Sequence, residues 1–475
     1  MRRIASIVII IALWSAIGCS RDGCSRPRAT EADGFVRLED GRFMIGDSVW
    51  FPLMVNYCVE LRGEGDSLSF VPAPYYGEGS IADHLATIAG WGFNSVRLCA
   101  DRMGDGDVGR ACGAALRQVA MTADSLGLRL MVLIRPPFDA RQRRRTAAML
   151  DQLADCPAVW AYDFMNEPLY FDPEPYRTKD DAVKIVGQWR RLMEAHAPHQ
   201  LFTVGQAEPI EVFEWDPSLL PVDFVELHTY HPLRVASEMY WYSRYVGRPW
   251  IVGETSLPAD GDSVPLSWQA TFMKESFACA LRYGAIGYGW WEFQDFPGGV
   301  NFEAQYSGLR TSEGVDKPAA AIVKELSPSD RATSSVKPVN FYNMLFYSNI
   351  AITGTVTDLN GRPIEGAVVR GWNDDWSVGM NTYTDPDGRF ELWCNALCVH
   401  FEVSAAGWSK AKFDAQPQFD GEAPDLAALP AQEREYQSID YRQYLLSDSS
   451  LLTLDSSQLS TEGLRATIPP VRLRK

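Results

Sequence analysis

The sequence lacks the motifs with which proteins most often bind nucleotides and metals. It contains no glycine-rich phosphate-binding loop of the ATP-binding type, no cysteine and histidine cluster with zinc-ligand spacing, and no HExxH motif. These absences exclude the most readily recognised nucleotide-dependent and zinc-dependent functions. The sequence therefore implies no cofactor and no metal site.

The chain also lacks an excess of positive charge. Lys and Arg number 44 against 61 Asp and Glu, so the formal net charge is −17. This balance argues against nucleic acid or an anionic membrane surface as the main partner. With 475 residues, of which 46% are hydrophobic, the chain is long enough for a large core and more than one domain.

The N-terminus has an apolar stretch that is too short to span a membrane comfortably. Two arginines precede this stretch at residues 4–17, and small residues then lead to Cys19, which is the layout of a secretory signal. The segment "SAIGC" resembles a bacterial lipobox, which implies that residues 1–19 are a signal peptide and that Cys19 carries the lipid that attaches the protein to a membrane. Ser20 resembles an outer-membrane address, with a periplasmic or secreted protein as the alternative. The polar residues 20–33 are predicted to be a tether.

The nine cysteines do not point to cysteine catalysis, because no nearby histidine pattern accompanies any of them. Cys58 and Cys99 end two successive predicted strands, and Cys394 and Cys398 lie close together near the C-terminus. In an exported chain each pair could form a disulfide. Buried thiols are the alternative for both pairs.

Residues 34–326 show apolar strand patterns that alternate with helical patterns. Two turn signals before residue 50 predict a β-hairpin that leads into the first of these strands. The alternation predicts a parallel (β/α)8 TIM barrel; a doubly wound open sheet is the alternative, but it would predict a glycine-rich first turn, which the chain lacks. Strands are expected at 51–57, 93–99, 128–134, 159–165, 201–205, 223–230, 249–254 and 285–291, and helices at 80–92, 109–127, 141–156, 179–196 and 268–284.

The C-terminal part has a different pattern. Residues 327–345 have the composition of a linker, and residues 346–475 show period-two alternation with an Asn-Gly and an Asp-Gly turn signal. This predicts a small antiparallel β-sandwich. It resembles the carboxypeptidase regulatory-like modules of exported bacterial proteins, which implies a closing strand at about 465–473 and an acidic insertion at about 416–463. A spacer or packing role is expected for this domain.

In a parallel barrel, catalytic groups lie at the C-terminal ends of the strands. Each candidate there also has a structural explanation of its own, such as a surface ion pair or a core histidine. Polar and aromatic residues at so many corresponding ends nevertheless indicate one site. These residues are Arg97, Asn166, Glu167, His228, Tyr230, Glu254 and Trp291.

The residue types fit the cleavage of a glycosidic bond. That reaction needs a proton for the leaving oxygen and a group that stabilises an oxocarbenium-like centre, and two carboxyl groups provide both. One must be protonated and the other ionised. Arg97 is expected to lower the pKa of Glu254, and Glu167 to bear the proton because it lies near that negative charge.

The motifs Asn-Glu-Pro at 166–168 and Gly-Glu at 253–254 resemble the signature of clan A glycoside hydrolases, particularly family 5 with its cellulases and mannanases. The opening hairpin, "NSVRL", "HTYHP" and "GWWEF" extend the likeness over residues 34–326. The resemblance implies that Glu167 is the acid/base and Glu254 the nucleophile. It further implies that Asn166 binds the sugar 2-hydroxyl, Arg97 and Tyr230 orient the nucleophile, His228 borders the acid/base, and Trp290 and Trp291 bind substrate, with Trp291 flooring the −1 subsite.

One departure from the family pattern leaves the sugar open. Family 5 enzymes usually have a histidine near the end of strand three, where this chain has Arg135. We expect an exported retaining β-glycoside hydrolase acting on a polysaccharide, with a β-mannan or β-glucan favoured, and with contact to a membrane through the lipid only. A non-catalytic carbohydrate-binding protein on the same barrel is the alternative, but binding alone needs no carboxylate pair.

Overall fold

The computed structural model describes residues 34–64, 67–100, 109–174, 176–328, 336–338, 341, 350–376, 379–394, 396–421 and 463–475. The expected signal peptide with Cys19 and the expected tether lie outside the described residues. Among the residues described, no helix is both long enough and apolar enough to cross a membrane.

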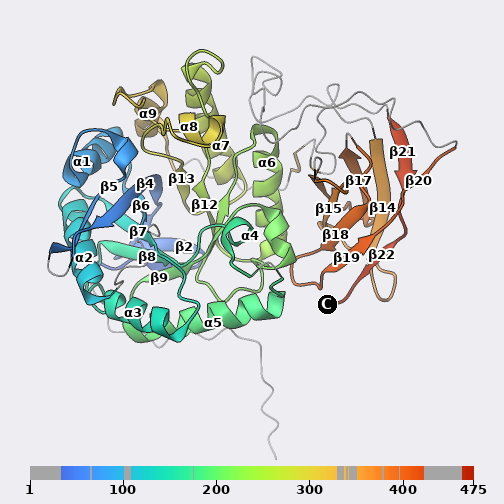
Figure 1. Cartoon of the computed structure of the whole chain (residues 1–475), viewed down its shortest axis with the longest axis horizontal. Coiled ribbons are helices and arrows are strands. Elements are labelled where there is room, and N and C mark those ends of the chain that lie inside the picture. Colours follow the sequence, from blue (N-terminus) through green and yellow to red (C-terminus); the bar gives the residue numbers. More distant parts are fainter. Residues whose placement is uncertain are drawn as a thin grey trace, which may run out of the picture. The chain divides into compact units, whose positions relative to one another are not determined.

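A parallel barrel forms the first part of the described chain (Figure 1). Each expected strand segment contains a strand, and the pairing order is β10-β11-β12-β13-β4-β6-β7-β8-β9. Only Val204 separates β9 from β10, so the barrel is nearly closed and the predicted fold class is confirmed. The strands are β4 (Leu53–Arg62), β6 (Ser95–Cys99), β7 (Arg129–Leu133), β8 (Val159–Asp163), β9 (Leu201–Thr203), β10 (Gly205–Gln206), β11 (Val225–His228), β12 (Trp250–Glu254) and β13 (Tyr288–Trp290). The short strand β5 (Ser69–Pro72) pairs with the end of β4.

The expected helical segments all contain helices, and α1, α2, α3 and α5 lie outside the strands along the left and lower side of Figure 1. Local signals set the ends of α1: Ser80 and Asp83 form a capping box at its start, and Gly92 takes a left-handed conformation at its end. The longer helices are α1 (Ile81–Trp91), α2 (Arg110–Ser125), α3 (Ala140–Leu150), α5 (Lys179–His196), α6 (Pro232–Trp241) and α7 (Leu266–Arg282). Short helical segments are η2 (Pro74–Tyr76), α4 (Pro168–Phe171), η3 (Pro209–Phe213), η4 (Tyr242–Val246), α8 (Phe302–Tyr306), α9 (Pro318–Ile322) and η5 (Val323–Glu325).

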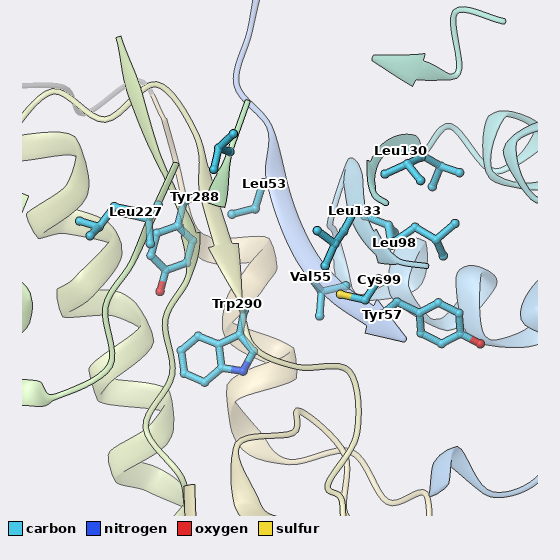
Figure 2. Packing of buried hydrophobic residues seen from close by; sticks show 14 of the residues in the cluster. Leu53, Val55, Tyr57, Leu98, Cys99, Leu130, Leu133, Leu227, Tyr288 and Trp290 are labelled. Atoms are coloured by element: carbon cyan, nitrogen blue, oxygen red, sulfur yellow. The ribbon is translucent and has the colours of Figure 1, made fainter. Parts of the chain in front are cut away.

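Side chains alternate along each strand between the helices and the barrel interior. Val55, Leu98 and Trp290 belong to the apolar cluster shared with the helices (Figure 2). Inside the barrel, Met54 and Ala161 belong to an apolar cluster near the strand starts. Two residues further along the same strands, the interior positions become the polar residues Asn56 and Asp163. The polar layer of the barrel interior therefore lies directly on an apolar layer.

The predicted N-terminal hairpin is confirmed. It consists of β1 (Arg37–Glu39), β2 (Arg42–Ile45) and β3 (Ser48–Trp50), which pair antiparallel. Phe43 packs edge-on against Trp160 and Phe224, with ring centroids 5.1 and 5.2 Å apart. The hairpin thus covers the apolar end of the barrel, opposite the polar layer.

The second part of the described chain is a sandwich of two sheets around its own apolar core. The expected closing strand is present but divided, because the two prolines before Val471 lack the N–H groups that a continuous ladder needs. Both halves pair parallel with β14, so that sheet is mixed rather than purely antiparallel. One sheet contains β14 (Ile350–Asp358), β17 (Arg389–Cys394), β20 (Gln418–Phe419), β21 (Leu464–Thr467) and β22 (Val471–Leu473); the other contains β15 (Val368–Trp372), β16 (Gly379–Tyr383), β18 (His400–Ser404) and β19 (Ala411–Asp414). Of the expected acidic insertion, residues 422–462 lie outside the described residues, and β20 belongs to the sheet.

The sandwich shares buried apolar surface with the barrel. Phe341, in the expected linker, is buried and stacks on Tyr383 of the sandwich with ring centroids 4.8 Å apart. It also packs edge-on against Tyr240 of α6 at 4.8 Å. Val368 and Tyr383 both belong to the apolar cluster of the barrel. A domain that acted only as a spacer would not need to share a buried apolar core with the barrel.

Both cysteine pairs consist of neighbouring buried thiols without a disulfide. Cys58 and Cys99 lie opposite each other in the β4–β6 register. A hydrogen bond with Cys58, followed by burial, raises the pKa of Cys99 well above its ordinary value. Cys398 is likewise hydrogen-bonded to Cys394, which with burial raises its pKa. Thiols that resist ionisation suit a structural role.

Candidate active site

The site is built around Arg97, which lies on β6 and has no exposed surface. Burial by itself would lower the pKa of Arg97, but the carboxylates around it raise that pKa well above its ordinary value. The guanidinium is therefore a permanent buried cation. It contacts Asp163 Oδ2 at 2.6 Å, Glu226 Oε1 at 2.9 Å, Asn166 Oδ1 at 2.9 Å, Asn56 Oδ1 at 2.9 Å, and Glu254 Oε1.

Glu254 ends β12 and is 3% exposed. Its Oε1 accepts a hydrogen bond from Arg97, and its Oε2 accepts one from the Tyr230 hydroxyl. Burial raises the pKa of Glu254, whereas the positive charges of His228 and Arg97 act in the opposite direction. The predicted effect of Arg97 is present, but the net pKa of Glu254 is raised, because the desolvation of a carboxylate this deep in the barrel outweighs the attraction of the arginine.

Position 253 in the Gly-Glu motif is a glycine for a steric reason. A Cβ on Gly253 would lie 2.0 Å from Glu226 Oε1, so any side chain there would displace the carboxylate that pairs with Arg97. Gly205 has a similar role, because its Cβ would lie 2.9 Å from the His228 ring and 3.0 Å from Asp163 Oδ2. These two glycines leave room for the charged layer.

Glu167 lies in the loop after β8 and has an unusual backbone. Its φ of 39° and ψ of 73° place it in the left-handed region, which residues other than glycine rarely adopt. Its N–H donates to Gly205 O at 2.8 Å, and Pro168 then begins the short helix α4. The carboxyl group is 14% exposed, and its Oε1 lies 3.0 Å from His228 Nδ1. The loop therefore turns Glu167 toward the other charged groups.

The two glutamates face each other beside His228. One oxygen of Glu167, one oxygen of Glu254 and one ring nitrogen of His228 all lie within 4.8 Å of one another. This upper limit lies below the roughly 6.5 to 9.5 Å that separates the carboxyl groups of inverting glycosidases, and it agrees better with the roughly 5 to 5.5 Å of retaining ones. Burial by itself would lower the pKa of His228, but Glu254, Glu167 and Glu226 together raise it to about 10. His228 is thus a cation between the carboxylates at neutral pH.

The same three atoms could in principle surround a metal ion. The atoms that would bind a metal ion already have hydrogen-bond partners, however. Glu254 accepts from Arg97 and Tyr230, and the two ring nitrogens of His228 lie 3.0 Å from Glu167 and 3.3 Å from Glu226. A cation would have to displace these bonds next to two buried positive charges. The residues therefore do not fit a metal centre.

The structure brings Arg97, Asn166, Glu167, His228, Tyr230 and Glu254 together, as the sequence predicts. Neither Arg97 nor His228 has any exposed side-chain surface. Both contact the glutamates, which agrees with their expected positions beside the nucleophile and the acid/base rather than with direct contact to a sugar.

The assignment of Trp290 to substrate binding is wrong. Its indole is fully buried in the apolar cluster (Figure 2). It packs edge-on against Phe272 and donates from Nε1 to Ser307 O at 3.0 Å. Because side chains alternate along β13, Trp290 faces the helices together with Tyr288. Trp291, the next residue, is half-buried, and its role as the floor of a sugar subsite stays a prediction.

Three buried polar residues of the site were not among the sequence candidates: Asn56, Asp163 and Glu226. Asp163 and Glu226 had a visible signal, since each is a charged residue inside an otherwise apolar strand, where an unpaired charge would be costly. Glu226 also stands two residues before His228 and so shares its face of the strand. Asn56 bonds through Nδ2 to Gly253 O and Trp290 O, both at 3.0 Å, and thereby ties β4 to β12 and β13.

Glu303 is a further carboxyl group of this end of the barrel. Burial raises its pKa to about 7, and the charges of Glu167, Glu208 and Glu254 add to that rise. It belongs to the short helix α8, in a segment whose sequence shows no helical or strand periodicity. No sequence signal indicated that this residue lies near the pair.

Comparison with known proteins gives only structural likenesses. No family model and no curated protein matches the sequence. An exo-β-1,4-mannosidase from Opitutaceae bacterium strain TAV5 has 17% identity and a TM-score of 0.47, with 64% of this chain covering 62% of that one. The Streptomyces cattleya protein described as GH5_18, in complex with Manβ1-4GlcNAc, has 18% identity and a TM-score of 0.46, with coverage of 59% and 79%. A β-glucuronidase from Bacteroides uniformis has 11% identity and a TM-score of 0.47, with coverage of 80% and 48%.

Proposed function

We propose that the protein is a retaining β-glycoside hydrolase that cleaves O-glycosidic bonds of a polysaccharide, with a β-mannan or β-glucan favoured. One observation carries the proposal: Glu254, whose two oxygens accept hydrogen bonds from Arg97 and Tyr230, faces Glu167 with oxygen atoms within 4.8 Å. A pair of carboxyl groups at this separation suits double displacement.

In the first step Glu254 attacks the anomeric carbon while Glu167 gives its proton to the leaving oxygen. The glycosidic bond breaks and an ester bond forms between the sugar and Glu254. Arg97 and Tyr230 fix the orientation of Glu254 before the attack, so little reorganisation is needed as its charge is transferred to the ester.

In the second step Glu167 takes a proton from water, and the water oxygen attacks the anomeric carbon. The bond to Glu254 breaks, and the two inversions give net retention of configuration. His228 stands 3.0 Å from Glu167, and its positive charge stabilises the carboxylate that exists between the two steps. Asn166 accepts from Arg97 through Oδ1, which directs its amide NH2 as the group to meet the sugar 2-hydroxyl.

The proposal is tested by measuring reducing-sugar release from a panel of mannans, glucans and xylans. We expect release from a β-mannan or a β-glucan. Proton NMR at early times should show a product with the β-configuration of the substrate. An inverted product would overturn the retaining assignment, and no release from any member of the panel would overturn the hydrolase assignment.

We also propose that the protein is exported and attached to the outer membrane through a lipid on Cys19, on the basis of the signal pattern. Mass spectrometry of the mature N-terminus tests this. An N-terminus elsewhere, with no lipid on Cys19, would contradict it.

A further inference from the structure

The left-handed backbone of Glu167 needs support from its surroundings. Such a conformation costs free energy for a residue with a side chain, and it persists only where neighbouring groups enforce it. One support is the hydrogen bond from Glu167 N to Gly205 O at 2.8 Å. A second lies two residues further on, at the start of α4.

That second support is the buried carboxyl group of Glu211, which belongs to η3 and is 1% exposed. Its Oε1 accepts from Leu169 N at 2.9 Å and from Ala207 N at 3.4 Å. The first N–H groups of a helix have no partner within the helix and need an outside acceptor. Glu211 therefore fastens the chain just after Glu167 to the chain that follows β10.

The chain around Glu211 is supported in turn by the sandwich. Both β15 and β18 pack against η3. A few residues beyond η3, Asp216 Oδ2 accepts from Gly407 N and from Lys179 Nζ, each at 2.8 Å. Lys179 Nζ also donates to Trp408 O at 2.6 Å. Segment 209–216 is thus held between the acid/base loop and the second domain.

We propose that Glu211 is a positioning residue for Glu167 and that the sandwich keeps it in place through η3. The inference rests on the proposed role of Glu167 as acid/base. It gives the C-terminal domain a part in the reaction that is independent of sugar binding. Glu254 depends on the sandwich less directly, because its partners Arg97 and Tyr230 come from the barrel.

The protonation of Glu211 makes a conservative variant available. Burial raises its pKa to about 8, although the N–H groups of Leu169 and Ala207 act in the opposite direction. Near neutral pH the group is therefore mostly an uncharged acid, for which glutamine is a close replacement. Glu211→Gln keeps an oxygen acceptor for Leu169 N, whereas Glu211→Leu removes it.

The test compares full-length Glu211→Leu and Glu211→Gln on two aryl β-glycosides of the sugar that the polysaccharide panel selects. One has a 2,4-dinitrophenyl leaving group, which needs no proton, and the other a 4-methoxyphenyl group, which does. We expect Glu211→Leu to lower kcat/KM about 100-fold on the second substrate and less than about fivefold on the first, because protonation by a positioned acid contributes roughly 10²- to 10⁴-fold. Glu211→Gln should restore most of the loss.

Asp223→Leu serves as the matched control. Asp223 also accepts from a backbone N–H, that of Phe202 in β9 at 2.8 Å, and it pairs in addition with Arg190 at 2.9 Å. Its loss should affect both substrates equally. An equal loss on both substrates for Glu211→Leu, or no loss, would overturn the inference.

Two further measurements distinguish a failure of this inference from a failure of the proposed acid/base role of Glu167. Lys179→Met should lower kcat/KM on the 4-methoxyphenyl glycoside about tenfold more than on the 2,4-dinitrophenyl glycoside. This variant tests the inference even if Glu211→Leu does not fold. A crystal structure of a Glu211 variant needs no activity: Glu167 should leave the left-handed region in Glu211→Leu and keep it in Glu211→Gln. An unchanged Glu167 in Glu211→Leu would overturn the inference even if the wild type proved inactive on every substrate.

Discussion

The two glutamates of the site have different supports. Glu254 ends a barrel strand, and both of its oxygens are bonded to side chains of the barrel. Glu167 lies in a loop with a left-handed backbone. Its own N–H donates to Gly205 O, and the N–H of Leu169 donates to the side chain of Glu211. The position of Glu254 depends on the nearly closed ring of strands, and that of Glu167 on loops that the second domain packs against.

This difference suggests which changes affect which chemical step. A barrel strand is rigid because its neighbours bond to it on both sides, so Glu254 is aligned wherever the barrel is intact. A loop position has to be specified contact by contact. Changes far from the barrel should therefore impair proton transfer before they impair nucleophilic attack.

The largest effect is expected for Glu254→Ala, which removes the nucleophile. We expect kcat to fall by roughly 10⁴-fold or more, equally for activated and unactivated leaving groups, because no covalent intermediate can form. Steady-state kinetics on both aryl glycosides measures this. A loss confined to the poor leaving group would reverse the two assignments.

Glu167→Ala should have a smaller and selective effect. On the 4-methoxyphenyl glycoside kcat/KM should drop by about 10²- to 10⁴-fold, since the leaving oxygen receives no proton. On the dinitrophenyl glycoside it should change little, and azide should restore kcat by attacking the trapped intermediate. The azide product should have the β-configuration; an α-azide would show that the other glutamate was the one removed.

Gly253→Ala probes the nucleophile side without changing a charge. The new Cβ would lie 2.0 Å from Glu226 Oε1, so the pair between Glu226 and Arg97 must shift. We expect a loss of about 2 to 4 kcal/mol in the free energy of unfolding, together with lower activity on both substrates.

The matched control is Gly187→Ala, in α5. There the nearest atom to the new Cβ is the end of the Arg191 side chain, at 3.8 Å. Alanine should stabilise this helix by up to about 1 kcal/mol. If urea unfolding gave both variants the same stability, the steric explanation of the Gly-Glu motif would be wrong.

The last prediction concerns His228, which lies 3.0 Å from Glu167 and 3.6 Å from Glu254 and so contacts both glutamates. Its pKa is raised in the folded protein to about 10, from about 6.5 when unfolded. The stabilisation is therefore fully present below pH 6.5 and is lost as the pH rises toward 10. Urea unfolding between pH 6 and 10 should show this decline in the wild type and a flatter profile in His228→Gln. His196→Gln, which changes a partly exposed histidine paired with Asp151, should keep the wild-type slope.

Much of this molecule could be predicted from local sequence patterns. Apolar runs such as "LRLMVLI" and "VWAYDFM" are long enough, and rich enough in β-formers, to locate strands, and the helical spacing between them indicates a parallel barrel. Once that topology is known, the strand ends meet at one edge, so Arg97, Glu167 and Glu254 could be placed together before any coordinates. The Asp-Gly turn of the N-terminal hairpin was readable for the same local reason.

Only the tertiary structure decided the properties that depend on several chain segments at once. Trp290 and Trp291 look equivalent in sequence, but the register of β13 turns the first toward the helices. The direction of the Glu254 pKa depends on depth of burial, which no motif records. The contact of Glu211 with Leu169 N joins η3 to α4, 42 residues apart. Patterns along a chain determine which elements form, because hydrogen bonding and side-chain alternation are local, whereas desolvation and the choice of polar partner depend on how distant segments pack.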